Sequence, residues 1–248
     1  MLKLLEEEKK HQNISELRQR LRIAERAGGQ IRPTYSFGLP DLDLALGSGL
    51  ATGCLHEVTC AAGDGAATGF VAALAAGIAG GQGSVLWCLP RPDLYGPGLA
   101  AAGLDLSRLI LATTEHAADC LWAMEEAARS GAVAAVVGEV DRLSLTAARR
   151  LQLASETGGV TSFLLRTGMS VDDAAAVAAT RWQIVAAPSS GRLWPEEPCW
   201  QAELLRCRGG RPGSWTLSWQ EGAWRHAAGD LAMAAPVCDR PAAAETGA

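Results

Sequence analysis

The segment HEVTCAAGDGAATGF, residues 56–70, decides the fold of this chain of 248 residues. A short, mostly apolar run ends in a glycine-rich turn, and an alanine-rich stretch follows. A strand, a turn and a helix in this order form a phosphate-binding loop, whose backbone N–H groups hold phosphate oxygens at the start of the helix. The segment therefore predicts a buried strand over 54–60, a helix over 66–80 and an α/β core.

The loop lacks the side chains that bind a nucleotide. Its key positions are Cys60, Gly63, Asp64, Gly65, Ala66 and Ala67. In the pattern G-x4-G-K-[ST], the lysine position falls on Ala66 and the hydroxyl position on Ala67. Asp64 adds a negative charge, and two like charges about 4 Å apart repel by roughly 4 kcal/mol at an effective dielectric constant of about 20. We expect a degenerate loop, with no catalytic residue, no cofactor and no metal.

Composition narrows the possible chemistry further. The three lysines, Lys3, Lys9 and Lys10, lie in the first ten residues, so the body of the chain has arginine as its only permanent side-chain cation. A loop lysine and a lysine general base are therefore excluded from the core. The net charge of −5 provides no general basic field for nucleic acid, so DNA contact is expected to be weak or indirect.

Cysteines and histidines do not form a recognisable metal or disulfide pattern. Seven scattered cysteines without a CxxC pair favour a reducing, cytoplasmic setting. The four histidines are far apart, with no acidic or cysteine partners at metal-ligand spacing. No apolar run is long enough to span a bilayer, and the acidic residues after the first leucines are unlike a signal peptide.

Strand and helix patterns alternate beyond the loop. The expected strands cover 54–60, 84–89, 109–113, 132–140 and 160–166, and the expected helices cover 66–80, 99–104, 116–131 and 145–158. Such βαβ alternation predicts a mostly parallel sheet covered by helices. On the helix over 116–131, Glu125 and Glu126 are expected to form a solvated face.

The pattern changes after Arg181. Apolar and polar residues alternate over 214–219, and a GGRPG turn precedes them, so we expect an antiparallel hairpin added to the parallel sheet. We therefore expect three parts: a helical arm over 1–32, a core over 33–226, and a flexible tail over 227–248.

Tryptophan and arginine are concentrated in this last part of the core. Six of the eight tryptophans lie between 182 and 224, and arginines lie among them. Tryptophan beside arginine suits protein interfaces or stacking on single-stranded bases. Trp182, Trp200, Trp215 and Trp219 are expected to fill the core under the hairpin. The candidates for contact with a partner or DNA are Arg206, Arg208, Arg211, Trp194 and Trp224.

The order of these segments resembles the RecA family. Residues 37–58, FGLPDLDLALGSGLATGCLHEV, are similar to the approach to the RecA ATPase core, and residues 127–144 to the strand that carries its Walker B acid. More closely, the chain resembles the ImuA family, through the degenerate loop, RRLQLASETGGVTSFLLR (149–166) and ELLRCRGGRPGSWTLSW (203–219). The resemblance covers roughly residues 35–225.

The resemblance also shows what is missing. The catalytic glutamate of the RecA family falls near Pro90 and Arg91, and its Walker B aspartate falls on Gly138. Glu139 is one residue away, which in a strand directs it to the opposite face. Because the loop lysine is also absent, three parts of a phosphoryl-transfer site are missing together, and we expect no ATPase activity.

The ImuA resemblance implies an accessory protein of damage-induced, error-prone translesion DNA synthesis. Its implied partners are the polymerase-like protein ImuB and, through it, an error-prone DnaE-type polymerase, with RecA as a further candidate and location at the nucleoid during damage. One alternative is a RecA-like ATPase or switch in which Arg91 or Arg206 replaces the lysine. Another is a cell-division inhibitor of the SulA type, which would co-purify with FtsZ instead of a polymerase.

Overall fold

The computed structural model describes residues 33–61, 64–167, 177–188 and 198–227. The expected arm over 1–32 and nearly all of the expected tail lie outside these residues. Chain contacts separate residues up to Pro33 from a second unit that begins at Thr34, and the description below concerns this second unit.

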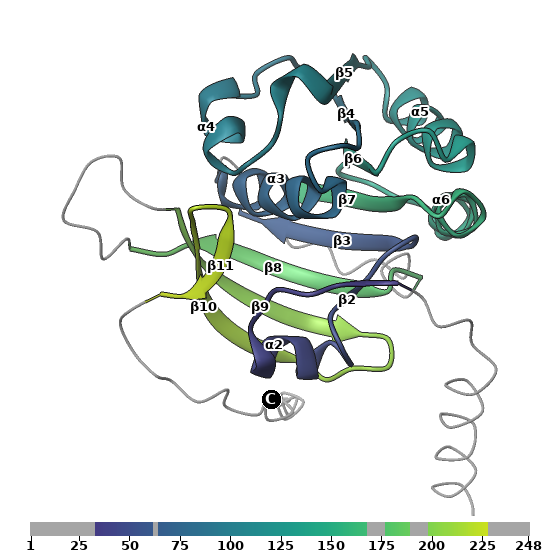
Figure 1. Ribbon diagram of the computed structural model, residues 1–248. Coiled ribbons are helices and arrows are strands. Elements are labelled where there is room, and N and C mark those ends of the chain that lie inside the picture. The colour runs from purple at the N-terminus through teal and green to yellow at the C-terminus, as the bar shows by residue number, and fades with distance from the viewer. Residues whose placement is uncertain (1–32, 62–63, 168–176, 189–197, 228–248) are drawn as a thin grey trace, which may run out of the picture. The chain divides into compact units, whose positions relative to one another are not determined.

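A nine-stranded sheet forms the centre of this unit, in the order β11-β10-β9-β8-β3-β7-β6-β4-β5 (Figure 1). Its parallel part consists of β3 (Leu55–Cys60), β7 (Thr161–Thr167), β6 (Ala135–Glu139), β4 (Val85–Leu89) and β5 (Leu109–Thr113). The connecting segments are α3 (Ala66–Ala79), α4 (Gly96–Ala101), a 3-10 turn at Leu106–Arg108, α5 (Ala117–Ser130) and α6 (Leu145–Gly158). The expected α/β class, with a mostly parallel sheet covered by helices, is confirmed.

Two hydrophobic cores lie on the two faces of the sheet. On one face, α3 packs through Phe70 and Leu74 against side chains such as Val58. On the other face, the stripe Cys120, Met124 and Ala128 of α5 packs with α6 against the sheet. All six residues of β3 are buried, as expected for a central strand covered on both faces. The short helix α4 begins three residues earlier than the expected helix over 99–104.

Strands β8 to β11 extend the sheet beyond β3, and we call them the antiparallel annex. Strand β8 (Thr180–Ala186) pairs parallel to β3 and antiparallel to β9 (Cys199–Cys207), which pairs with β10 (Gly213–Gln220). The chain then returns in β11 (Ala223–His226), a strand that the sequence pattern did not predict. The four tryptophans expected in the core are buried: Trp182, Trp200, Trp215 and Trp219.

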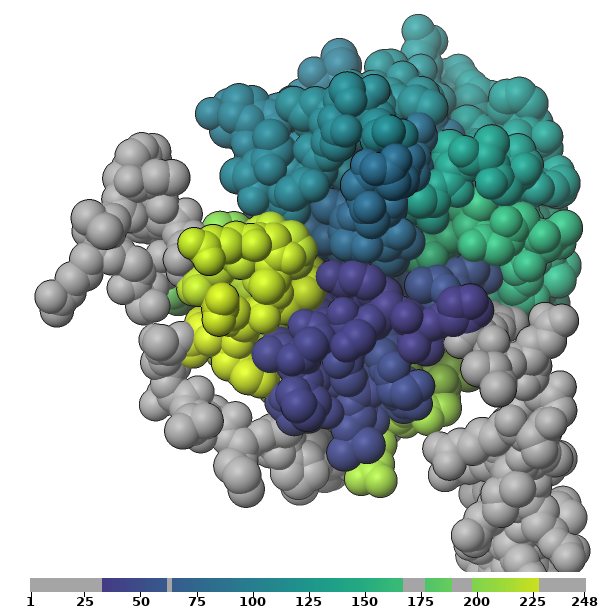
Figure 2. Space-filling model, in the orientation of Figure 1, coloured from purple at the N-terminus to yellow at the C-terminus, as the bar shows by residue number. Residues whose placement is uncertain are grey.

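The segment before β3 covers one face of the annex. It contains β1 (Thr34–Tyr35), α2 (Pro40–Ala45) and β2 (Leu50–Ala51), and Figure 2 shows it in purple against the yellow C-terminal strands. Asp41 accepts a hydrogen bond from Trp215 Nε1 at 2.8 Å and lies 3.0 Å from His226 Nε2. Asp43 accepts the backbone N–H of Phe37 at 2.9 Å, which stabilises the turn into α2. These carboxylates connect segments that are far apart in the sequence.

Candidate functional site

The glycine turn after β3 leads directly into α3, as its sequence predicts. Asp64 Oδ1 accepts a hydrogen bond from the backbone N–H of Ala66 at 2.9 Å. The backbone N–H of Ala67 offsets part of the rise in the pKa of the Cys60 thiol. The Ala66 amide, which would face phosphate oxygens in a nucleotide site, therefore already binds an acceptor of the chain itself. Gly63 lies outside the described residues.

The electrostatic environment of the turn is negative. Burial raises the pKa of the Cys60 thiol, and the nearby negative charges of Asp64 and Glu139 raise it further. No lysine is present in the described residues to oppose this field, because all three lysines precede residue 11. An anion approaching Cys60 would therefore meet two carboxylates.

Glu139 and Gly138 point to opposite faces of the sheet, as expected. A Cβ placed on Gly138 would collide with Met124 of α5. The Glu139 carboxylate instead accepts a hydrogen bond from Trp87 Nε1 at 3.0 Å, on the face that α3 covers. Burial raises the pKa of Glu139, with smaller contributions from nearby charges. The side chain beside the loop is therefore an acid one residue from the Walker B position.

The position expected for a catalytic glutamate lies in the segment after β4. Arg91 is largely exposed there, and its Nε lies 3.5 Å from Asp93 Oδ2. Among the described residues, no group of three or more His, Cys, Asp or Glu side chains could hold a metal ion. In the described part of the loop, the carboxylate of Asp64 binds the Ala66 amide, and the nearby Glu139 binds Trp87.

Arg208 and Arg211 lie in the turn between β9 and β10, and Arg206 lies near the end of β9. Arg206 is partly buried and donates to the carbonyl of Ala178 at 3.2 Å, and Arg208 donates to the carbonyl of Val177 at 2.7 Å. Burial lowers the pKa of Arg206, and the charge of Arg208 lowers it further. Arg211 is exposed in the turn. The fold therefore brings Arg206 and Arg208 together beside the start of β8, whereas the backbone N–H of Arg211 donates to the carbonyl of Ala45.

Trp224 is not an exposed contact residue, so that expectation is wrong. It is 5% exposed and packs against Phe37, Phe70, Trp200 and Trp219, and its Nε1 donates to the Tyr35 hydroxyl at 3.0 Å. The turn at Glu221 and Gly222 leads into β11, whose pairing with β10 places Trp224 opposite Trp219 on the core face. Trp194 lies outside the described residues.

The sequence reasoning missed an exposed tryptophan on α5. Trp122 is 62% exposed, and Leu153 on the neighbouring helix α6 is exposed to the same extent. The helical pattern contains the signal, because Trp122 lies opposite the inner stripe that Cys120 and Met124 form.

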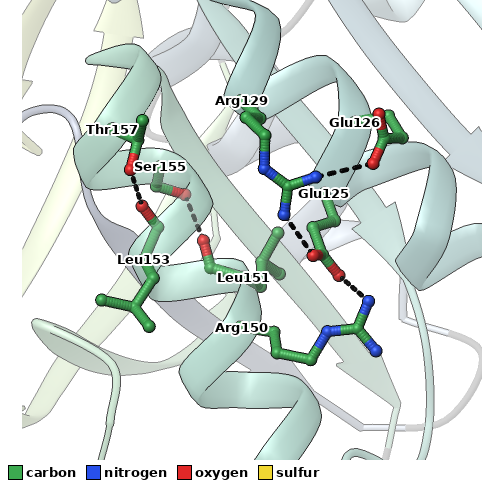
Figure 3. A network of polar contacts seen from close by, with 8 residues as sticks. All are labelled: Glu125, Glu126, Arg129, Arg150, Leu151, Leu153, Ser155 and Thr157. Atoms are coloured by element: carbon green, nitrogen blue, oxygen red, sulfur yellow. Dashed lines mark hydrogen bonds and ion pairs between the residues drawn. The ribbon is translucent and has the colours of Figure 1, made fainter.

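Glu125 is buried between α5 and α6, contrary to the expectation of a solvated pair (Figure 3). Its carboxylate binds Arg129 of its own helix and Arg150 of α6, the latter at 2.7 Å. Glu126 is exposed as expected and pairs with Arg129. The difference arises because Glu125 faces the neighbouring helix, which the sequence of α5 alone does not identify.

Comparison with known proteins identifies relatives of nearly full length. No family model matches the chain. It is 37% identical over 235 residues to Protein ImuA of Caulobacter vibrioides strain NA1000 / CB15N, covering 87% of this chain and 95% of that protein. The same values hold for Protein ImuA of strain ATCC 19089 / CIP 103742 / CB 15.

The chain belongs to the ImuA family.

Membership of the ImuA family agrees with the resemblance seen in the loop and in the segments 149–166 and 203–219. The described part of the chain contains no helix that is both long and apolar enough to cross a membrane.

Proposed function

We propose that this protein is a non-catalytic accessory protein of damage-induced, error-prone translesion DNA synthesis, built on a RecA-like core. It would support the polymerase-like protein ImuB and, through ImuB, an error-prone DnaE-type polymerase. Membership of the ImuA family supports the process, and the hydrogen bond from the Ala66 amide to Asp64 supports the absence of catalysis. RecA is a further candidate partner, direct DNA contact is weak, and the site of action is the cytoplasm, at the nucleoid during damage.

The hydrogen bond between Asp64 and the Ala66 amide carries the non-catalytic part of this proposal. A triphosphate would have to displace the carboxylate from the helix start and overcome its charge. The lysine that would compensate is replaced by Ala66, and Gly138 replaces the magnesium-binding acid. Glu139, held by Trp87, adds a second negative charge instead of supplying a ligand.

Calorimetric titration of the full chain with ATP and Mg²⁺ tests this directly. We expect no heat of binding and no release of inorganic phosphate above the blank. Micromolar ATP binding with steady hydrolysis would overturn the proposal in favour of a RecA-like ATPase. In that case Arg91→Ala and Arg206→Ala would show which arginine replaces the lysine.

Partner binding is proposed to use the basic turn after β9, together with the arm over 1–32 and the tail over 227–248. The annex region between 181 and 225 has six arginines against four glutamates, a net charge of +2, which is too small for strong DNA binding alone. Arg208 and Arg211 are exposed at the turn, where a partner could reach them.

Affinity capture from DNA-damaged cells tests the partner and the surface together. The tagged full chain is expected to retain the polymerase-like partner, and Arg208→Ala with Arg211→Ala is expected to reduce its recovery. Arg149→Ala, an exposed arginine on α6, is the matched control and should retain the partner. Loss of the partner on removing 227–248, with normal capture by the double variant, would place the interface in the tail. Recovery of FtsZ in place of a polymerase would contradict the proposed process.

A further inference from the structure

Among the described residues, β5 is an outer strand of the nine-stranded sheet and pairs on one side only, with β4 (Figure 1). Its side chains are poorly covered: Ile110 is 50% exposed and Leu111 is 49% exposed. Two further exposed apolar residues, Tyr95 and Leu106, belong to the segment that leads into this strand. Four of the ten large exposed apolar residues of the described chain therefore lie between residues 95 and 111.

The edge of β5 lacks the features that normally prevent strand pairing. Exposed edges are usually protected by charged side chains, proline or a bulge. The five residues of β5, LILAT, include no charge, proline or glycine, and its pairing with β4 is regular along its length. A strand of this kind is a template for pairing with another chain.

The backbone geometry shows which residues have their hydrogen-bonding groups directed outward. The amide of Thr114 donates to the carbonyl of Leu89 in β4. Because these groups alternate along a strand, Ile110 and Ala112 also direct theirs toward β4. The N–H and C=O groups of Leu111 and Thr113 and the C=O of Leu109 therefore face the open edge, whereas the Leu109 N–H donates to the carbonyl of Leu106.

We propose that this edge binds the same edge of a second copy of the chain. The two β5 strands pair antiparallel around a two-fold axis at Leu111, which joins two nine-stranded sheets into one. In this register Leu111 exchanges hydrogen bonds with its own copy, and the carbonyl of Leu109 accepts the amide of Thr113 of the other copy. A two-fold axis normal to the sheet requires paired residues to lie on the same face, which this register satisfies.

The side chains and flanking charges also fit a second copy. Ile110 lies opposite Ala112 of the other copy, so a large exposed side chain meets a small one at both ends of the interface. Arg108, which within its own chain pairs with Asp105 and donates to the carbonyl of Gln82, lies opposite Thr114 of the other copy and beside its Glu115. Because Glu115 is exposed, it adds a second carboxylate near this guanidinium on each side of the axis.

Cysteine cross-linking tests both the dimer and its register. Across the axis, the two Cα atoms of residue 111 lie about 5.5 Å apart, which is within the range of a disulfide. Leu111→Cys is therefore expected to give a covalent dimer under mild oxidation. Thr113→Cys is the matched control on the same strand and face, because its copy lies roughly 13 Å away, and should remain a monomer on a non-reducing gel.

The wild type is run in parallel to account for the native thiols. Cross-linking of Thr113→Cys equal to or greater than that of Leu111→Cys would overturn the proposed register. The proposed register would also be overturned if Leu111→Cys formed no covalent dimer at a concentration where light scattering detects the non-covalent dimer.

Light scattering after size exclusion tests self-association without cysteine chemistry. The wild-type chain of 25.9 kDa is expected to show twice this mass at high concentration and to dissociate on dilution. Leu111→Lys should remain monomeric, and Leu153→Lys, an equally accessible apolar position on α6, should still dimerise. Circular dichroism establishes that both variants are folded. A monomeric wild type at every concentration, or a dimeric Leu111→Lys variant, would overturn the proposal.

Discussion

Glu57 of β3 and Arg166 of β7 form an ion pair inside the protein, with 2.7 Å between Oε1 and Nη1 and both side chains at most 3% exposed. Arg181 of β8 lies on the other side, with its Nε 3.6 Å from Glu57 Oε2. Arg166 also donates to the carbonyl of Asp141, which follows β6. One carboxylate therefore lies between arginines of the two strands that flank β3.

Replacing Glu57 by glutamine should destabilise the fold strongly. The substitution leaves Arg166 buried beside Arg181 without the carboxylate, and breaking a buried pair on one side costs about 3–5 kcal/mol. Urea unfolding followed by circular dichroism measures the loss. Glu126→Gln, which removes an exposed partner of Arg129, is the control and should leave the midpoint unchanged. Equal stability of the two variants would show that the buried pair is not structurally important.

His56 should make the stability depend on pH in the mildly acidic range. It is fully buried, and desolvation lowers its pKa to about 4. Its Nδ1 lies 2.7 Å from the Thr180 hydroxyl, and its Nε2 lies 2.8 Å from the carbonyl of Ala51. The neutral ring therefore has both nitrogens hydrogen-bonded without a charge.

The sign of the effect follows from the two pKa values. The unfolded chain binds a proton at His56 near pH 6.5, whereas the folded chain binds it near pH 4. Stability should fall as the pH drops from about 6.5 to 4, by up to about 3 kcal/mol at roughly 1.4 kcal/mol per unit. Urea midpoints at several pH values measure this loss. His56→Gln should make the urea midpoint depend less on pH, whereas His226→Gln, at an exposed position, should not. If the midpoint of His56→Gln changed with pH as much as that of the wild type, His56 would not be the source of the pH dependence.

Asp64 should stabilise α3 in the way that a bound anion stabilises other helix starts. Replacing it with alanine removes the acceptor for the Ala66 amide and should cost about 1 kcal/mol. Sulfate should recover part of this loss, because the freed amide and the removed charge create an anion site. Thermal melts in sulfate and in chloride of equal ionic strength measure the effect. The wild type provides the reference for the general stabilisation by sulfate, and an equal gain in both proteins would refute the prediction.

Trp224 should matter for stability and Trp122 should not. Replacing a buried tryptophan by alanine leaves a cavity and costs about 3–5 kcal/mol, and Trp224→Ala would also remove the bond to Tyr35. Trp122→Ala alters an exposed side chain of the same type. In chemical unfolding, the midpoint of Trp224→Ala should therefore lie well below that of the wild type, and the midpoint of Trp122→Ala should be close to that of the wild type. Similar midpoints would contradict the packing seen in the annex.

Much of the core could be predicted because each element carries its own signal. Strand β5 and helix α6 have the bounds that the sequence predicts, Leu109–Thr113 and Leu145–Gly158. Ser144 caps α6 by accepting the Ala147 amide, and Gly159 ends it in the left-handed conformation. Strand β11 was missed because its four residues are too few to show an alternation.

The partner surfaces were harder to predict, because exposure depends on contacts between distant segments. Trp224 follows a turn in the sequence, but α3 and the segment before β3 cover it. Glu125 and Glu126 are neighbours of the same type in the sequence of α5. They differ because Glu125 binds Arg150 of α6.

The sequence by itself determined the alternation of strands and helices, the absence of a lysine from the body of the chain, and the degenerate loop. These properties depend on residue type and on spacing along the chain. Only the tertiary structure decided that β8 joins β3, which brings Arg181 to Glu57, and that β5 lies at the edge of the sheet that the described residues form. The reason is physical: periodicity shows which side chains share a face, whereas neighbouring segments far away in the sequence decide what covers that face.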